Sequence, residues 1–226
     1  MEVQASTYAQ GQWVSKARDA ITGASFDIRA KVMINACGPW ADEQNRGSGE
    51  ATEYHHLFSK GVHLIVDQIT DNKRVLTFFA SDGRMFFLIP MGPKTCIGTT
   101  DTQVESPEVT VTDEDRDFIL SNANALLDLE RLLTRDDIIA ERVGVRPLAI
   151  KGEGGIADWV QLSRKHVIEV DEANRHLTIF GGKLTDCLNV GDEVAQWVQR
   201  LGVTVPAPDT HWYGEPGASL RAEFML

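Results

Sequence analysis

Hydrophobic residues along this 226-residue chain either alternate with polar ones or gather in short apolar runs, and both patterns predict β-strands. Residues 8–36 predict a β-meander whose last strand covers Lys31–Ala36. Because that last run is almost entirely apolar, we expect it to be covered on both faces, as in a parallel sheet, and to end at Gly38-Pro39. Residues 46–56 show no apolar period and predict a mobile connection.

A block rich in β-branched and aromatic residues follows, with Ser81-Asp82-Gly83 as a hairpin turn. The runs that predict strands after residue 56 are Val62–Val66, Val75–Ala80, Met85–Pro90, Cys96–Thr100, Ile138–Val145, Trp159–Leu162, Val167–Val170 and Leu177–Phe180.

Two helices interrupt these strands. Thr112 and the three acids after it predict a helix start, because a hydroxyl and negative charges stabilise the free amides of the first turn. The second helix is predicted from about Leu184 to Leu201. The pattern therefore predicts a fold of the α+β or α/β class. We expect a mixed, mostly antiparallel β-sheet backed by helices and bracketed by two pieces of another layer, at 31–36 and 177–200.

Charge and cysteine usage limit the class of protein. A formal net charge of −11 argues against nucleic-acid binding, because phosphate contacts need a basic face. No apolar run approaches the roughly 20 residues that span a bilayer, and no signal peptide follows Met1, so we expect a cytoplasmic protein. Cys37, Cys96 and Cys187 are too widely spaced for a metal site or a disulfide framework, so we expect no metal and three small buried side chains.

Polar side chains in or next to the predicted strands are candidates for chemistry. Arg146 ends a strand beside Pro147, so its guanidinium could clamp a phosphate or a carboxylate, or simply pair with a surface acid. Arg164 could be a second clamp. His63 lies in an apolar strand, where it could take a proton from a hydroxyl or be a core histidine satisfied by a neighbour.

The strand that ends at Phe180 is followed by Gly181-Gly182-Lys183 and then by a helix. Such a unit offers free backbone N–H groups and the positive end of a helix dipole, which suit a phosphate or the electron-rich edge of a cofactor. A tight turn without a ligand is the alternative. Gly152–Ala157 also satisfies G-x-G-x-x-A, but no helical period follows it, so we expect a flexible loop there.

Seven segments, in this order, resemble the FAD-dependent glycerol-3-phosphate dehydrogenases over about residues 10–200. They are Asn35–Trp40, Lys60–His63, Ile97–Asp101, Leu133–Ile138, Gly144–Leu148, Ser163-Arg164 and Phe180–Thr185. The resemblance implies oxidation of sn-glycerol 3-phosphate to dihydroxyacetone phosphate, with hydride transfer to FAD and a quinone as final acceptor. It also implies peripheral association of the full-length parent with the cytoplasmic face of a membrane.

The resemblance implies roles for particular residues. Arg146, helped by Arg164, would bind the substrate phosphate or hydroxyl. His63 would take the proton of the C2 hydroxyl, unless Arg146 shares that role. The implied cofactor-binding positions are Gly181, Gly182, Lys183 and Thr185 along the flavin, and Ala36, Gly38 and Trp40 near the other end of the cofactor.

The sequence departs from the family in two places. The family usually continues K-L-T-T-Y-R, whereas Thr185 is followed here by Asp186-Cys187-Leu188, and the N-terminal G-x-G-x-x-G unit is absent. We therefore expect a fragment that is inactive by itself, retains little FAD and could form a homodimer through exposed strands. The expected segments are 1–45 and 166–202 as parts of the FAD domain, 46–165 as the substrate-binding domain and 203–226 as a tail.

Two alternatives to this interpretation remain. One is a related flavin-dependent amine or amino-acid oxidase, in which the arginine would bind a substrate carboxylate instead of a phosphate. The other is a non-catalytic binding domain.

Overall fold

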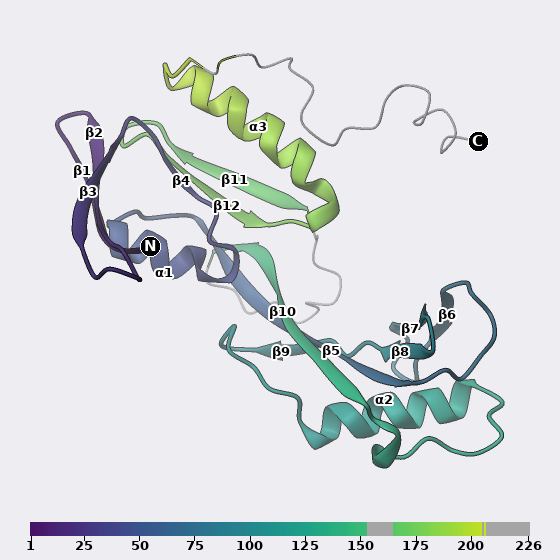
Figure 1. Cartoon of the computed structure of the whole chain (residues 1–226). Helices are drawn as coiled ribbons and strands as arrows, with labels where there is room; N and C mark the ends of the chain where they lie inside the picture. Colours follow the sequence, from purple (N-terminus) through teal and green to yellow (C-terminus); the bar gives the residue numbers. More distant parts are fainter. Residues whose placement is uncertain (153–164, 205, 207–226) are drawn as a thin grey trace.

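The computed structural model describes residues 1–152, 165–204 and 206, and its strands form three sheets (Figure 1). The first sheet contains β1 (Glu2–Ala9), β2 (Gln12–Arg18) and β3 (Ser25–Ala30). The second has the order β10 (Ala140–Lys151), β5 (Tyr54–Asp67), β8 (Lys94–Gly98), β7 (Met85–Met91) and β6 (Leu76–Phe79), and β9 (Thr102–Val104) also pairs with β5. The third has the order β11 (His166–Asp171), β12 (His176–Gly181) and β4 (Met33–Asn35).

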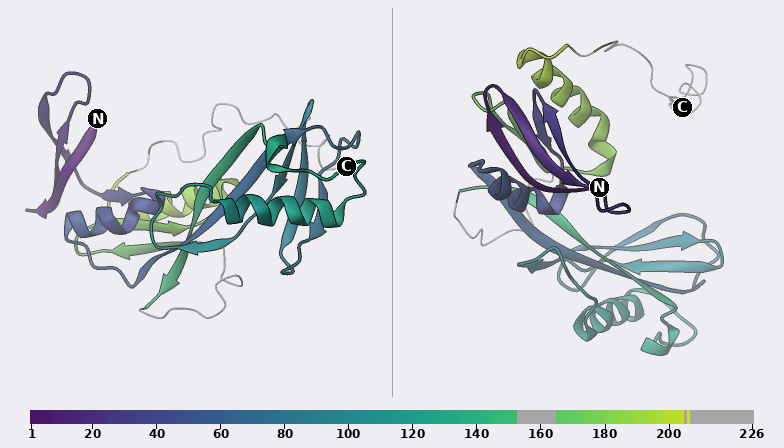
Figure 2. Two further views of the ribbon diagram at one scale, coloured as in Figure 1. Left: turned by 90° about the horizontal axis from the view of Figure 1, so that it is seen from below. Right: turned by 60° about the vertical axis from the view of Figure 1, so that its left-hand side comes forward.

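The helices lie against the second and third sheets. They are α1 (Ala41–Ser48), α2 (Asp113–Leu126) and α3 (Cys187–Arg200), together with short 3-10 turns η1 (Gly38–Trp40), η2 (Arg135–Asp137) and η4 (Leu184–Asp186). Figure 2 shows α2 lying across the second sheet and the first sheet projecting at the opposite end of the molecule. The expected class, a mixed and mostly antiparallel fold backed by helices, is confirmed. None of the helices in the described part of the chain is long and apolar enough to cross a bilayer.

The alternation of side chains along β5 creates two different faces on the second sheet. Val62, Leu64 and Val66 are fully buried in the main hydrophobic core, which also contains Ile119 of α2. Successive residues of a strand point to opposite faces, so His63 belongs to the face away from α2. The side of the sheet that carries polar chemistry is therefore set by the period of two in β5.

The start of α2 follows the sequence prediction. The Thr112 hydroxyl accepts from the Asp115 amide, and the Asp115 carboxylate accepts from the Thr112 amide, which is a reciprocal capping box. The same carboxylate lies 2.5 Å from the ammonium nitrogen of Lys60 on β5, and both side chains are buried. This ion pair fastens the first turn of α2 to the sheet.

The third sheet contains strands from both pieces of the other layer that the sequence predicts. β4 and β12 run parallel, with Asn35 opposite Thr178. The expectation that the apolar run 31–36 is covered on both faces is wrong: only Met33–Asn35 form a strand, at the edge of the sheet, and Ile34 remains 42% exposed. α1 contacts β4 and β12, while α3 lies over the sheet in Figure 1 and its Glu193 reaches His166 of β11.

Two further expectations need correction. Residues 46–56 are not a mobile connection, because α1 extends to Ser48 and β5 begins at Tyr54. Cys96 is buried as expected, but Cys37 and Cys187 are exposed. The predicted loop at 152–157 and strand at 159–162 lie outside the described residues, apart from Gly152 itself. The four segment boundaries stay a prediction.

A long antiparallel ribbon of β5 and β10 joins the second sheet to the third. The pairing is continuous from Ala140 opposite Ile65 to Lys151 opposite Tyr54 (Figure 1). At the start of β5, the Glu169 carboxylate of β11 accepts hydrogen bonds from the amides of Glu53 and Tyr54. Arg146 therefore lies in the middle of the ribbon that connects the two sheets.

Candidate functional site

A hollow of about 460 Å³ lies over the ribbon and is lined by residues of β5, β7, β8 and β10. Two cross-strand pairs define it, Gly61 opposite Gly144 and His63 opposite Arg142. Residues directly opposite in an antiparallel pair share a face, so these four lie on the side of the sheet away from α2. The glycine pair contributes no side chains, which leaves the base of the hollow open.

Arg146 reaches into this hollow because Gly61 leaves room for it. A Cβ placed on Gly61 would lie 2.4 Å from both terminal nitrogens of the guanidinium. Arg146 Nη2 donates to Thr99 Oγ1 at 3.3 Å, and Nη1 lies 3.8 Å from Asp101 Oδ1, which also accepts from the Ser59 hydroxyl. The segments 97–101 and 144–148, which are far apart in sequence, therefore meet around one guanidinium.

His63 lies beside this arginine and is half-buried. Burial lowers the pKa of His63, and the positive charges of Arg146 and Arg142 lower it further. Gly98 of β8 permits this arrangement, because its φ is +145° and a Cβ there would lie 3.1 Å from His63 Cδ2. The ring is consequently neutral at neutral pH and able to accept a proton.

Arg142 is a member of the hollow that the sequence analysis missed. It lies opposite His63, lines the same hollow, and lies close enough to the Cys96 thiol for its charge to act on that group. Burial raises the pKa of Cys96, against the effect of the Arg142 charge. The available signal was spacing: Arg142 precedes Arg146 by four residues, so a strand places both on one face.

The Gly181-Gly182 turn is held by a second group that the sequence analysis missed. The Gly181 amide donates to His56 Nε2 at 3.2 Å, and His56 Nδ1 lies 2.8 Å from the Asp42 carboxylate of α1. Because Nε2 accepts, Nδ1 carries the proton and donates to Asp42. Burial opposes ionisation of Asp42, but the contacts with His56 outweigh it and lower the pKa of the carboxyl.

The cofactor candidates lie around the carboxyl ends of the parallel strands. β4 and β12 end at the same edge of their sheet, and η1 packs against β12 and β10. Ala36, Trp40, Lys183 and Thr185 are exposed there, while Gly38, Gly181 and Gly182 have positive φ angles of 56°, 64° and 89°. In open α/β sheets this edge is where ligands bind.

The glycine turn also packs against the ribbon. A Cβ on Gly181 would lie 3.4 Å from the amide nitrogen of Ala149, three residues beyond Arg146 on β10. Lys183, however, does not line the hollow that contains His63 and Arg146. The convergence of all three side chains stays a prediction, and Arg164 lies outside the described residues.

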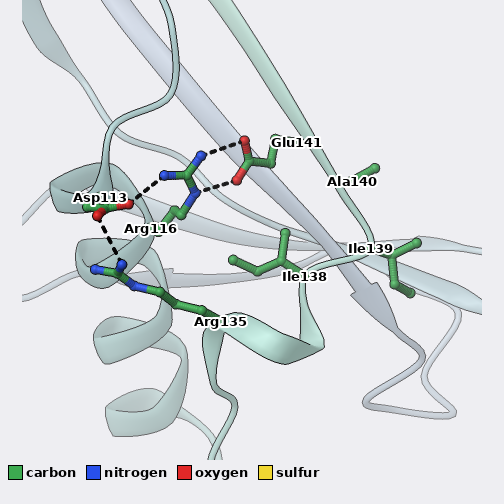
Figure 3. A pocket seen from close by; sticks show the side chains of 7 residues that line it. All are labelled: Asp113, Arg116, Arg135, Ile138, Ile139, Ala140 and Glu141. Atoms are coloured by element: carbon green, nitrogen blue, oxygen red, sulfur yellow. Dashed lines mark hydrogen bonds and ion pairs between the residues drawn. The ribbon is translucent and has the colours of Figure 1, made fainter.

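In a second pocket, on the side of α2, the arginine side chains form ion pairs that connect elements of the fold (Figure 3). Arg116 of α2 binds Glu141 of β10 and Asp113, and Arg135 binds Asp113 and Asp117. These contacts join α2, η2 and β10. The segment 133–138, one of the seven that carried the family resemblance, therefore fastens α2 to the sheet. Within the residues that the structure describes, no cluster of three or more His, Cys, Asp or Glu side chains could hold a metal ion.

Comparison with known proteins identifies the family of this arrangement. A family model described as FAD dependent oxidoreductase matches residues 2–202. The chain belongs to that family. It is 35% identical over 186 residues to the aerobic glycerol-3-phosphate dehydrogenase of Bacillus subtilis, covering 80% of this chain and 32% of that protein. The chain thus spans about a third of the length of this curated relative.

Solved structures of the family agree. Glycerol-3-phosphate dehydrogenase from Bacillus halodurans, complexed with FAD, superposes with a TM-score of 0.74 at 34% identity, covering 91% of this chain and 40% of that one. Glycine oxidase from Geobacillus kaustophilus superposes with a TM-score of 0.60 at 19% identity, covering 96% of this chain and 52% of that one, which shows a shared fold only. The resemblance carried by the seven segments is confirmed.

Proposed function

We propose that this chain forms the substrate hollow and part of the flavin site of an FAD-dependent glycerol-3-phosphate dehydrogenase. The reaction is the oxidation of the C2 alcohol of sn-glycerol 3-phosphate to the ketone of dihydroxyacetone phosphate. One observation carries the proposal: a histidine whose pKa is lowered lies beside a guanidinium in a glycine-based hollow. Relatives 34–35% identical, named as glycerol-3-phosphate dehydrogenases, support this substrate.

Within the hollow, Arg146 binds the anionic end of the substrate. A guanidinium offers paired donors that match the oxygens of a phosphate. Thr99 and Asp101 hold the guanidinium from one side, so its position is set before the substrate arrives. Arg164 is proposed as a second contact to the same group.

His63 accepts the proton of the C2 hydroxyl. When the C2 carbon loses a hydride, the hydroxyl must also lose its proton for a ketone to form, and a base within reach lowers the barrier to that step. The neutral imidazole suits this role, because burial and, after it, the charges of Arg146 and Arg142 keep the pKa of His63 low and the ring unprotonated. The same charges stabilise negative charge that develops on the oxygen.

FAD fits the edge where β4 and β12 end, and when bound it supplies the acceptor for the hydride. Gly181 and Gly182, whose positive φ angles favour glycine, present backbone without side chains, and the first amides of the following 3-10 turn have no acceptor within that turn. We propose Gly181, Gly182, Lys183 and Thr185 along the flavin, with Lys183 stabilising negative charge there. Ala36, Gly38 and Trp40 are proposed for the more distant part of the cofactor.

The remaining partners are proposed from the family resemblance. They are a quinone as final electron acceptor, a cytoplasmic location with peripheral membrane association of the full-length protein, and a homodimer through exposed strands. Because the chain spans about a third of its curated relatives, we expect it to lack dehydrogenase activity and to retain little FAD by itself. Flavin absorbance that stays with the purified chain through gel filtration would contradict that expectation.

The test is turnover of the full-length protein with an artificial electron acceptor, comparing glycerol 3-phosphate with glycine and sarcosine. We expect turnover of glycerol 3-phosphate alone, and turnover of glycine or sarcosine instead would establish the oxidase alternative. Arg146→Ala should raise KM and lower kcat together, because it removes a contact to the substrate and positive charge near the reacting oxygen. Unchanged kinetics in this variant would remove Arg146 from the site.

A further inference from the structure

Arg142 shares the hollow with His63 and Arg146 but belongs to none of the segments that carry the family resemblance. Its side chain extends from β10 past His63 to the Cys96 thiol on β8. A thiol is a weak acceptor, whereas a guanidinium carries five N–H donors. Among the described residues, no carboxylate forms an ion pair with Arg142.

The register of the ribbon places the two arginines on one face of β10, along the same hollow. Arg146 starts opposite Ser59, but its guanidinium lies over Gly61, one cross-strand pair nearer to Arg142. Both arginines line the same hollow, and the charges of both add to the effect of burial in lowering the pKa of His63, so a phosphate group bound in the hollow would contact both through charge-assisted hydrogen bonds. The glycine pair between them leaves that space open: no atom lies within 4 Å of a Cβ placed on Gly144.

The charges in the hollow also leave a need for Arg142. The Arg146 guanidinium has the Asp101 carboxylate 3.8 Å away, so this pair contributes little net charge. A phosphate monoester carries a charge of roughly −1.5 to −2 near neutral pH. Arg142, which forms no ion pair with a carboxylate among the described residues, adds positive charge to the hollow.

We infer that Arg142 joins Arg146 in binding the phosphate group of the substrate, above the Gly61–Gly144 pair and next to His63, in addition to the contact proposed for Arg164. This inference rests on the proposed function for the identity of the phosphate-bearing molecule. Binding of phosphate itself can be tested independently of turnover. Arg142 is thereby a substrate-binding residue that sets specificity for a phosphorylated alcohol.

The first test compares Arg142→Gln with Arg29→Gln in the full-length protein. Arg29 is an exposed arginine of β3, outside the hollow, so its variant removes the same charge without touching the site. We expect Arg142→Gln to raise KM for glycerol 3-phosphate by about 10-fold or more, with a smaller change in kcat, and Arg29→Gln to leave both unchanged. Equal KM values for wild type and Arg142→Gln would overturn the inference.

The second test measures binding of inorganic phosphate to the same proteins by titration calorimetry, without substrate or turnover. We expect Arg142→Gln to weaken phosphate binding about 10-fold, as Arg146→Gln should, whereas Arg29→Gln binds like the wild type. If wild type binds phosphate but does not oxidise glycerol 3-phosphate, the proposed function fails and the phosphate site stands. If only Arg146→Gln loses phosphate, Arg142 is excluded while the proposed function survives.

Arg142→Lys separates a loss of phosphate binding from a folding defect in the glutamine variant. Lysine keeps the charge but lacks the planar fork, so we expect phosphate affinity between those of wild type and Arg142→Gln. A correctly folded lysine variant, judged by circular dichroism, that binds phosphate as tightly as the wild type would exclude paired hydrogen bonding by Arg142.

Discussion

Gly61→Ala offers the sharpest test of how Arg146 is held. A Cβ at this position would lie 2.4 Å from Nη1 and Nη2 and 2.6 Å from Cζ of Arg146. Ordinary contacts between such atoms are roughly 3.5 Å, so the guanidinium must move by about 1 Å. A displacement of that size in a substrate-positioning group can cost up to about 100-fold in rate. We expect kcat/KM of the full-length enzyme to fall about 10- to 100-fold.

Stability should change little in the same variant. The displaced atoms are the far end of a flexible side chain, and alanine is favoured over glycine in a strand by roughly 0.5–1 kcal/mol. We therefore expect the free energy of unfolding, measured by urea denaturation, to stay within about 1 kcal/mol of the wild type. A large loss of stability would mean that the backbone, rather than the guanidinium, yields to the methyl group.

Gly144→Ala is the matched control for the displacement of Arg146. Gly144 lies directly opposite Gly61, and a Cβ there has no neighbour within 4 Å. The readout is the titration of His63 by NMR, since burial and, after it, the Arg146 charge lower the pKa of that ring. Gly61→Ala should raise the pKa of His63 toward its ordinary value, and Gly144→Ala should not. Identical His63 titrations and kinetics in wild type and Gly61→Ala would refute this account of the hollow.

Two further predictions concern buried charge and pH. Lys60→Met leaves the buried Asp115 carboxylate without its partner and should lower the free energy of unfolding by about 3–5 kcal/mol in urea denaturation. Lys16→Met, in an exposed pair, should cost less than about 1 kcal/mol, and equal losses would contradict the argument. Burial lowers the pKa of His176 to about 4, so the unfolded chain binds more protons between pH 4 and 6.5 and acidification through this range destabilises the fold. His176→Gln should flatten that part of the dependence of Tm on pH, and an unchanged slope would exclude His176.

The sequence pattern could predict the elements in which local and tertiary signals agree. The acids after Thr112 predict the capping box, and Asp82-Gly83 predicts the β6–β7 hairpin, in which Gly83 has a φ of +81°. The apolar run around His63 predicts a strand, and β5 covers it. In each case the conformation is set by residues that are close in sequence.

Other features depend on partners that are distant in sequence. The segment around His56 shows no apolar period, yet His56 is buried. Its ring forms hydrogen bonds with Asp42, 14 residues away, and with the Gly181 amide, 125 residues away. Ile34 belongs to an apolar run, but a three-residue edge strand leaves it exposed. Arg142 could have been found from its spacing with Arg146, but the spacing alone did not reveal the glycine pair between them.

The continuous pairing of β5 with β10 makes the chemistry of the hollow sensitive to chain length. Arg142 and Arg146 share one face only while Gly144 stays opposite Gly61. Deleting one residue within β10 would reverse the face of every side chain beyond it and point one of the two guanidinium groups toward α2. Evolution can therefore exchange side chains along this ribbon one at a time, but it cannot readily lengthen or shorten the strand between the two arginines.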